Sequence, residues 1–560
     1  MQQLNDTAFV VAGSQLQDHE QGIKPFIAII DPYGNPKNIH YYDTLGINSV
    51  RCVTGVFANN ELVFSGQYDN YYIGGSDWIS ISYFLKLDLN GNVKQFLLYD
   101  SLYLRQWTGT IKQTPDNYYL MGGWAGVTAQ SPIQDEEWLM HLIKTDTSGN
   151  IIWQHYYDLA NDLRYLQVVH PAPDNSGYYL IGTVNLDYMQ HPDWADMIFV
   201  KTDTAGNVLY DYVWHDEEQE HPVDVIGTPD GGMLVVGSMR PAQFGEDGIM
   251  RGRVVKLDPD CGVDWFKRYF YGAGFSRIVA APDGNYVLGG GMGNPDPLLY
   301  DSDAMLVKIT PTGDVLWRRR YGTNQQNYLY HLIADSDGGY IFVGRTDSIE
   351  IDRAFVYMVK TNCMGLLTEP TAAFAYQTTA GSHLVELVNQ SQYVYPDSID
   401  GGHYIWDFGD GSPPYVCGRG YGACPDVVTH EYAAAQGQHT ITLTAVVCSD
   451  TSAVTALVAL GSGIGGQSVG VEVVEAGAVG SVGVYPNPAA DKVYISYRLG
   501  EDKEALLQIY DISGKSVLRT ALQGSGTQEL STANLAPGIY VLQAILNGTA
   551  IAQQKIVIVK

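Results

Sequence analysis

The chain has 560 residues, of which 17% are charged and 12% are aromatic. At this length one hydrophobic core is not enough, and we expect about three domains. Asp and Glu number 61 against 32 Lys and Arg, a formal net charge of −29. Such an acidic chain repels nucleic acid and anionic lipid, and it has no apolar run of about 18 residues that could cross a membrane. The composition therefore suits a secreted protein, or one that binds divalent cations diffusely, and it argues against nucleic acid or an inserted bilayer as partners.

One repeated unit fills residues 1–368. Its first half is an apolar strand, an Asp-x-x-Gly-Asn turn and a second strand, and its second half reads Asp-Gly-Gly-aromatic-apolar-apolar-x-Gly. The turn glycines of the first half fall at Gly34, Gly91, Gly149, Gly206, Gly262, Gly313 and Gly365. These glycines lie 51 to 58 residues apart. Repeats of this length with about four short strands are typical of β-propeller blades, so seven copies of each half predict a seven-bladed β-propeller. A β-solenoid is the alternative, although solenoid repeats are usually shorter.

The order of the halves bears on how the ring closes. The chain starts with a second half, at residues 6–13, and the repeats end with a first half. We therefore expect a closing blade shared by both ends, which leaves no free strand edge. This blade lacks one or two strands, and no basic and apolar leader follows Met1. Both observations predict that the N-terminus is incomplete and that the missing residues include a signal peptide.

The repeats offer candidate ligand contacts but no catalytic motif. Tyr71, Tyr72 and Trp78 lie in one aromatic-rich loop and Trp124 in another, where aromatic rings suit stacking against sugars; the alternative is that they pack between blades. The Asp-x-x-Gly-Asn turns favour tight hairpins, with Asp capping the turn and Gly supplying a positive φ, over calcium sites. Neither G-x-S-x-G nor H-E-x-x-H occurs. We expect no catalytic residue and no cofactor, calcium excepted.

The pattern changes in residues 369–459. An apolar strand at 384–389 is followed by YIWDFGDG at 404–411, by His430 and Tyr432, and by a Thr-rich strand at 440–446. This order resembles a PKD domain, an immunoglobulin-like β-sandwich. The resemblance implies that Trp406 packs in the core and that Asp407 and Asp410 hold the turn through side-chain to backbone bonds, with calcium binding as the alternative.

Six cysteines are too few to form the main scaffold. Cys417 and Cys424 lie seven apart in a Gly-rich insertion at 413–426, and we expect them to form a disulfide in an oxidising compartment. Cys52 lies in an apolar strand pattern and is expected to be a buried thiol. The pairing of Cys261, Cys363 and Cys448 does not follow from the sequence.

Two segments complete the chain. Residues 460–482 are rich in Gly and Val and predict a linker. Residues 483–560 alternate apolar and polar side chains at 492–497 and again near the end, which predicts a small all-β sandwich. Their balance of charge is +1, against −30 for the preceding residues, and this marks them as a separable module.

This last module carries four motifs in order. They are 484–488, with Tyr485, Pro486, Asn487 and Pro488; 509–515, with Gly514; 535–540, with Pro537, Gly538 and Tyr540; and the closing strand at 555–560. The series resembles the C-terminal sorting domain (type A) of proteins exported by the type IX secretion system of Bacteroidetes-type bacteria, over about a seventh of the chain. The resemblance implies that the type IX translocon and its attachment machinery are partners. It also implies release or attachment at the outer cell surface.

The whole pattern favours a secreted cell-surface binding or adhesion protein without catalysis. Its propeller would bind a polysaccharide or glycan, its PKD domain would act as a spacer, and its tail would direct export. One alternative is a carbohydrate-active enzyme with a carboxylate pair in the propeller funnel. Another is a structural subunit of an extracellular layer or appendage.

Overall fold

In the computed structural model the described residues are 1–5, 8–16, 23–31, 34–42, 50–58, 61–70, 79–99, 105–127, 137–159, 163–185, 195–215, 218–241, 250–293, 302–322, 326–348, 353–396, 401–433, 437–448, 450–460, 465–468, 481–485, 492–498, 504–511, 515–523, 525–536, 538–546 and 549–558. Their regular structure consists of β-strands, which confirms the predicted all-β class. None of these residues belongs to a helix that is long and apolar enough to cross a membrane. The chain divides into two compact units, residues 1–361 and 362–560.

Unit 1 is built from antiparallel sheets in which consecutive strands pair in chain order. The strands of the first four groups are β1 (Gln2–Asn5), β2 (Ala8–Leu16), β3 (Ile23–Ile30) and β4 (Pro36–Tyr41); β5 (Val50–Ala58), β6 (Glu61–Asn70), β7 (Ile79–Asp88) and β8 (Val93–Tyr99); β9 (Arg105–Gln113), β10 (Tyr119–Val127), β11 (Glu137–Thr145) and β12 (Ile151–Tyr157); and β13 (Leu163–Pro171), β14 (Gly177–Asn185), β15 (Asp196–Asp203) and β16 (Val208–Trp214). The other three are β17 (Glu218–Gly227), β18 (Met233–Pro241), β19 (Arg251–Leu257) and β20 (Val263–Tyr271); β21 (Ala273–Ala280), β22 (Tyr286–Gly293), β23 (Ser302–Ile309) and β24 (Val315–Tyr321); and β25 (Gln326–Ala334), β26 (Tyr340–Ser348) and β27 (Arg353–Thr361). The second and third groups are joined through one residue pair, Ser80 with Arg105.

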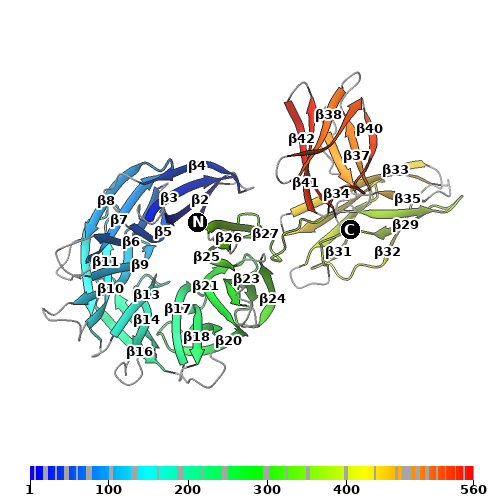
Figure 1. The fold of residues 1–560 in the computed structure, drawn as a ribbon. Coiled ribbons are helices and arrows are strands. Elements are labelled where there is room, and N and C mark those ends of the chain that lie inside the picture. The colour runs from blue at the N-terminus through cyan, green and yellow to red at the C-terminus, as the bar shows by residue number, and fades with distance from the viewer. Residues whose placement is uncertain are drawn as a thin grey trace. The chain divides into compact units, whose positions relative to one another are not determined.

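These groups are arranged around a common axis as the blades of a β-propeller (Figure 1). The first strand of each blade, such as β9, β13 or β17, lies toward the axis, and the fourth lies at the rim. Hydrophobic cores form between successive blades; one such core joins Val168 and Ile181 to Val235 and Val255. Because each blade packs against neighbours on both faces, its central strands, such as β15 and β23, are buried on both sides.

The ring does not close through a shared blade, so this prediction is wrong. Residues 2–41 form a complete four-stranded sheet, and β25, β26 and β27 form a separate sheet of three described strands. The two sheets pack face to face instead, with Phe9 and Val11 against Ile341 and Val343. Gln3 and Ser336 add two hydrogen bonds, of 3.0 and 3.3 Å, across the same junction. Buried apolar contact therefore joins the first and last blades.

The Asp-x-x-Gly-Asn turns connect the third and fourth strands of the blades as tight hairpins. In the copy at Asp146, Oδ1 accepts the backbone N–H groups of Ser148 and Asn150, each at 2.8 Å, and Oδ2 accepts the Asn150 side chain at 2.8 Å. Gly149 takes φ +81°. The carboxylate is thus already used by the turn itself. In the copy at 258–262 the left-handed residue is Cys261, at φ +67°, and not Gly262, so the predicted position of that turn glycine is wrong by one residue.

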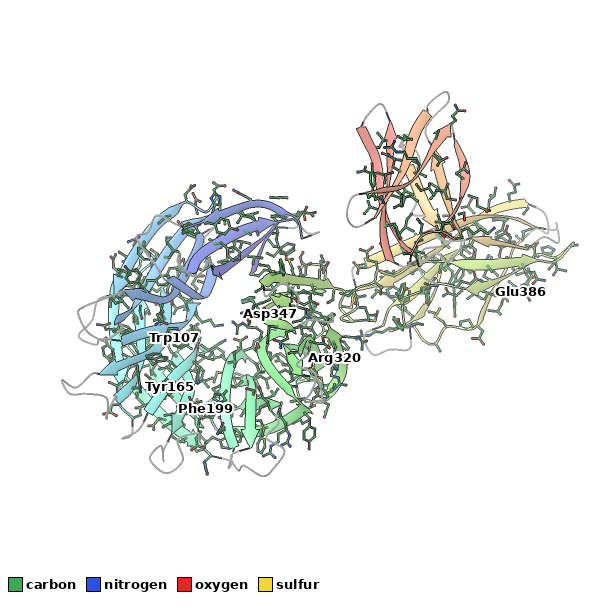
Figure 2. The ribbon with its side chains drawn as sticks, viewed as in Figure 1. Trp107, Tyr165, Phe199, Arg320, Asp347 and Glu386 are labelled. Carbon is green, nitrogen blue, oxygen red and sulfur yellow. A yellow bond between two sulfur atoms is a disulfide. The ribbon has the colours of Figure 1, made fainter. Side chains whose placement is uncertain are left out.

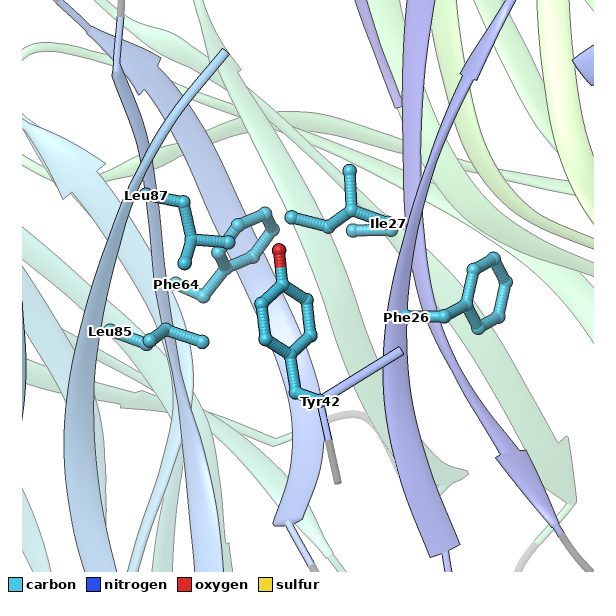
Figure 3. Close-up of a pocket in the computed structure, with 7 residues that line it drawn as sticks. Phe26, Ile27, Tyr42, Phe64, Leu85 and Leu87 are labelled. Carbon is cyan, nitrogen blue, oxygen red and sulfur yellow. The ribbon is translucent and has the colours of Figure 1, made fainter. Parts of the chain in front are cut away.

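Tyrosine hydroxyls link one blade to the next. Each of these tyrosines lies at or near the end of a fourth strand, is at most 9% exposed, and donates to the carbonyl of the turn glycine in the following blade. The four pairs are Tyr42 with Gly91 (2.6 Å), Tyr99 with Gly149 (2.7 Å), Tyr157 with Gly206 (2.8 Å) and Tyr269 with Gly313 (2.8 Å). Tyr42 also lines a small apolar pocket between the first two blades (Figure 3). We call these contacts tyrosine clasps.

A β-bulge interrupts the inner strand in six blades. Its position repeats from blade to blade, at residues 53, 109, 167, 223, 276 and 330. The residue before the bulge pairs with a glycine on the second strand, and there is no room for a side chain at that glycine. A Cβ at Gly123 would lie 1.7 Å from the Trp107 carbonyl oxygen, and one at Gly290 would lie 1.9 Å from that of Gly274. This close approach explains the last glycine of the repeated motif.

Unit 2 begins with a β-sandwich. One sheet has the order β32 (Val427–Glu431), β29 (Leu384–Asn389), β28 (Phe374–Thr378), β35 (Gly465–Ser468), and the other has the order β31 (Tyr415–Gly418), β30 (His403–Asp407), β33 (Gly437–Val447), β34 (Asp450–Leu460). Trp406 is fully buried between them, against Phe374. The backbone of β35 pairs with β28, so the predicted linker at 460–482 contains a strand of this sandwich.

The seventh Asp-x-x-Gly-Asn-like turn belongs to this sandwich. Asn362 Oδ1 accepts the backbone N–H groups of Met364 and Leu366, at 2.9 and 3.0 Å, as Asp does in the other turns. Met364 is buried in the sandwich core, however, and Cys363 forms a disulfide with Cys448. Unit 1 therefore ends at residue 361, before the predicted boundary at 368.

A second, smaller sandwich follows. Its sheets are β36 (Ser481–Tyr485), β37 (Lys492–Arg498), β40 (Ser525–Ser531), and β39 (Ser516–Gln523), β38 (Glu504–Asp511), β41 (Gly538–Leu546), β42 (Thr549–Ile558). Its own core includes Val493, Ile495, Leu507, Leu542 and Ile556. Val493 and Ile495 lie two residues apart on β37, as Leu507 and Ile509 do on β38, which agrees with the predicted period of two.

Candidate ligand-binding site

The two ends of the blades differ in what they can offer a ligand. Tight turns connect the first strand to the second and the third to the fourth, and their Asp side chains are used within the turns or by lysines. Lys144 binds Asp116 at 2.8 Å and Lys308 binds Asp283 at 2.8 Å, with both lysines almost fully buried. The longer connections, from the second strand to the third and from one blade to the next, leave the opposite strand ends. A ligand-binding face is therefore expected at these opposite ends.

Four aromatic side chains gather at that end of two neighbouring blades. They are Trp107 on β9, Trp124 on β10, Trp138 on β11 and Tyr165 on β13, and we call them the aromatic patch. Trp124 lies at the centre, with ring centroids 4.5 Å from Trp138, 5.8 Å from Trp107 and 6.1 Å from Tyr165. All four are half-buried. Figure 2 shows Trp107 and Tyr165 on adjacent inner strands.

Glycines let these rings lie against the backbone. A Cβ at Gly126 would lie 2.5 Å from the Trp138 ring, which covers its cross-strand partner, and one at Gly109 would lie 2.6 Å from Trp107. The flanking backbone therefore holds these rings in place. Perpendicular contacts between the rings, a geometry that aromatic pairs favour, hold them as well. A rigid group of half-buried aromatic rings loses little conformational entropy when it binds a flat partner.

A second group lies further along the inner strands, toward the tight turns that lead to the second strands. Five consecutive inner strands contribute one side chain each: Lys112 on β9, His170 on β13, Asp224 on β17, Arg277 on β21 and His331 on β25. We call this group the axial cluster. Lys112 Nζ lies 4.0 Å from Asp224 Oδ1, although their blades are separated by the one that carries His170. Such a contact requires both side chains to point toward the axis.

Burial governs the electrostatics of the axial histidines. Desolvation lowers the pKa of His170, and the charge of nearby Lys112 lowers it further, while the Pro171 carbonyl and Asp224 act in the opposite direction. Desolvation also holds the pKa of His331 well below its usual range, and the charges of the Met1 amino group, Arg277 and Lys112 add to the effect. Both imidazoles are therefore neutral near pH 7.

The described inner strands do not provide a carboxylate pair of the kind that glycoside hydrolysis requires. Their described carboxylates are Glu220 and Asp224. Glu220 is fully buried in an ion pair with Arg253, whose guanidinium lies over Trp214. Asp224 stands beside Lys112 and accepts the backbone N–H of Ile278 at 3.1 Å. In the part of the chain that the structure describes, no group of three or more His, Cys, Asp and Glu residues could hold a metal ion.

Of the four predicted stacking residues, the structure describes only Trp124. Tyr71, Tyr72 and Trp78 lie outside the described residues. Trp124 lies in the aromatic patch, where it contacts its own blade and the next one. The other three members of the patch and the axial cluster were not predicted, because they come together only through the inner-strand bulges and the ring.

The two aspartates of the first sandwich hold their turn. Asp407 accepts the Gly409 N–H at 2.9 Å, and Asp410 accepts the Ser412 N–H at 3.0 Å and lies 2.8 Å from His430 Nε2. Hydrogen bonds from Ser412 and His430 hold the pKa of Asp410 well below its usual range. The His430 ring stacks on Phe408 at 3.9 Å, which ties this turn to the core.

The cysteines form two disulfides. Cys417 pairs with Cys424 within the insertion, and Cys363 pairs with Cys448. Cys261 is a buried free thiol whose pKa burial raises to about 12. The side chain of Cys52 lies outside the described residues.

Few of the tail motif residues are described. Tyr540 is buried in the small sandwich and donates to the Ala536 carbonyl at 2.9 Å, and Gly538 begins β41. Tyr485 ends β36, but its side chain is outside the described residues, as are Pro486, Asn487, Pro488, Gly514 and Pro537.

Comparison with solved structures finds many distant similarities, among them the following three. An exo-β-1,3-galactanase from Clostridium thermocellum is 11% identical, with 77% of this chain and 93% of that chain covered and a TM-score of 0.28. A glycoside hydrolase of family 32 from Bifidobacterium adolescentis is 10% identical, with 98% and 97% covered and a TM-score of 0.28. A puromycin-hydrolysing peptidase from Mycobacterium tuberculosis is 11% identical, with 61% and 51% covered and a TM-score of 0.32. Scores this low assign no activity, and no curated protein matches the chain.

The tail gives a definite result. Residues 483–559 match the family model of the secretion system C-terminal sorting domain. This match confirms the predicted address: the type IX secretion machinery handles the chain, which is exported across the outer membrane to the cell surface or the extracellular space.

Proposed function

We propose that the chain is a secreted cell-surface binding protein whose propeller binds a polysaccharide or glycan. The aromatic patch carries this proposal, because half-buried and mutually braced rings suit stacking against the apolar faces of sugars. Its position agrees with the proposal, since it lies at the blade ends from which the longer connections leave. The sandwich that resembles a PKD domain would separate this face from the sorting domain, and adhesion to extracellular glycans would follow.

A carbohydrate-active enzyme is the second candidate, and the axial chemistry argues against it. Of the two carboxylates described on the inner strands, Glu220 is buried in an ion pair and Asp224 is engaged by Lys112. The described inner strands thus offer no pair of carboxyl groups of the kind that glycoside hydrolysis needs, whereas a binding function needs none.

The test is a glycan and polysaccharide array probed with the full chain, with released sugars measured in parallel. We expect binding without product release. Trp124→Ala should abolish binding, whereas Tyr271→Ala, which removes a 62% exposed aromatic ring from the rim strand β20, should leave it unchanged. Circular dichroism would establish that both variants are folded. Product release would favour the enzyme, and an array without binding by the folded wild-type chain would refute the sugar-binding function.

A further inference from the structure

Charge is distributed unevenly in the propeller unit. Residues 1–361 contain 24 Lys and Arg against 44 Asp and Glu, a balance of −20. The axial cluster reverses this sign, because Lys112 and Arg277 are cations and Asp224 is its one carboxylate. The axial cluster is therefore a local basic centre in an acidic unit.

The inner-strand bulges place these groups. Asp224, Arg277 and His331 each follow directly after the bulge of their strand, and Lys112 and His170 lie two residues further along. A bulge adds one residue to one strand and so turns the following side chains relative to the sheet. Because the bulge recurs at the same position, Asp224, Arg277 and His331 start from one level of their strands, and Lys112 and His170 start from a level two residues further along.

The contacts leave positive charge available. The Asp224 carboxylate lies 4.0 Å from Lys112 Nζ and also accepts the Ile278 N–H at 3.1 Å. Arg277 donates to the Ser276 carbonyl at 2.6 Å, and no described carboxylate lies within 4.0 Å of its guanidinium. The Nδ1 atom of His331 is buried and has no hydrogen-bond partner among the described residues. A guanidinium with free donors presents the fork that a carboxylate matches.

We propose that the axial cluster binds the carboxylate of an acidic sugar, a uronic acid unit, with Arg277 as its main partner and Lys112 and His331 beside it. The identity of the ligand as a sugar rests on the proposed function. On β9, Trp107 and Lys112 pair with Trp124 and Leu120, which are four residues apart on β10, about 13 Å along a strand, so a bound oligosaccharide would extend from the aromatic patch to the axial cluster. The acidic exterior repels a long polyanion, which favours a ligand with one acidic unit at its end.

Isothermal titration calorimetry of the full chain tests this site, with D-glucuronate as the probe and D-glucose as its neutral counterpart. We expect glucuronate to bind at least tenfold more tightly than glucose at low ionic strength. Arg277→Gln should weaken glucuronate binding by tenfold or more, because it removes a charge-assisted hydrogen bond. Arg277→Lys keeps the charge but loses the fork, and should weaken binding less.

Arg268→Gln is the matched control, since it makes the same change at an exposed position on the rim strand β20. It should leave glucuronate binding unchanged. Equal binding of glucuronate and glucose, or equal loss in the two Gln variants, would overturn the acidic-sugar site. Array binding that depends on Trp124 but not on Arg277 would overturn it and leave the proposed function intact. Glucuronate binding that depends on Arg277, without array binding, would support the site and refute the polysaccharide function.

Discussion

The glycine opposite each inner-strand bulge should be intolerant of any side chain, and two neighbouring residues test this. Gly290 pairs with Phe275, directly before the bulge on β21. An added Cβ would lie 1.9 Å from the Gly274 carbonyl oxygen and 2.9 Å from two further backbone atoms. At Gly291 the nearest atom would be Ser302 Oγ, at 3.5 Å, which is an ordinary contact. Gly290→Ala and Gly291→Ala thus place the same methyl group on adjacent residues of one strand.

The cost of Gly290→Ala can be estimated from the structure. Relieving the clash requires the inner strand to retreat by more than 1 Å, because the obstacle is backbone and not a movable side chain. This retreat breaks about two backbone hydrogen bonds, each worth about 1 kcal/mol net, and loosens the buried ring of Phe275. Overpacking itself costs about 1–3 kcal/mol. We expect a loss of about 3 kcal/mol or more, against less than about 0.5 kcal/mol for Gly291→Ala.

Urea unfolding followed by tryptophan fluorescence would measure the difference. Nine of the ten tryptophans lie in residues 1–361, so the emission reports mainly on the propeller. With a denaturant dependence of about 3 kcal/mol per M, the midpoint of Gly290→Ala should fall by roughly 1 M. A Gly290→Ala midpoint equal to that of the wild type, or an equal fall for both variants, would refute the explanation of this glycine by close approach.

Three further predictions concern stability. Tyr157→Phe removes a tyrosine clasp and leaves a buried carbonyl without its donor. It should lower the unfolding free energy of the propeller by about 1–2 kcal/mol in the same urea assay. An unchanged midpoint would contradict a stabilising role for the clasp. Asp283 is desolvated, but hydrogen bonds from Lys308 and Asn285 lower its pKa from 3.8 to about 2. The ionised Asp283 therefore contributes to stability above pH 4, on the order of 2 kcal/mol, and this contribution is lost as the pH falls toward 2. Asp283→Asn should flatten the pH dependence of the urea midpoint in this range. A variant with the same slope as the wild type would argue against this carboxylate. Replacing Cys363 and Cys448 by Ala opens a loop closed over 85 residues and should destabilise the first sandwich by about 4 kcal/mol, measured by calorimetry; a transition at the wild-type temperature would contradict this.

The repeat and its strands were predictable because they are encoded locally. Alternation, turn residues and period all lie within a single unit, so the hairpin at Asp146 follows from five consecutive residues. Closure was not predictable in this way, since the number of strands contributed by each end depends on contacts such as Phe9 with Ile341, far apart in sequence. The seventh turn was assigned to the propeller for the same reason: its local sequence is that of the other turns, while Met364 packs in the sandwich.

The candidate site was predicted only in part. Trp124 was predicted to lie in a loop between blades, but it lies on β10, within the aromatic patch. The axial cluster was missed, because Lys112, Asp224 and Arg277 lie in unremarkable strand patterns and meet only across the ring. A repeated glycine opposite each bulge was the available signal, and aligning the inner strands on it would have placed Asp224 and Arg277 at one level and Lys112 two residues further along.

The tyrosine clasps have a consequence for the history of such rings. Each clasp runs in the same direction, from the last strand of one blade to the turn of the next, so a blade brings one hydroxyl and one carbonyl of the same kind. A gene segment that encodes one repeat could therefore be copied or lost while the bonds at the new junction are still made. Between the fourth and fifth blades the clasp position holds Trp214, and the Tyr179 hydroxyl bonds the Pro259 carbonyl at 2.8 Å instead. The same two blades stay joined by a different residue, as expected of parts that have diverged after duplication.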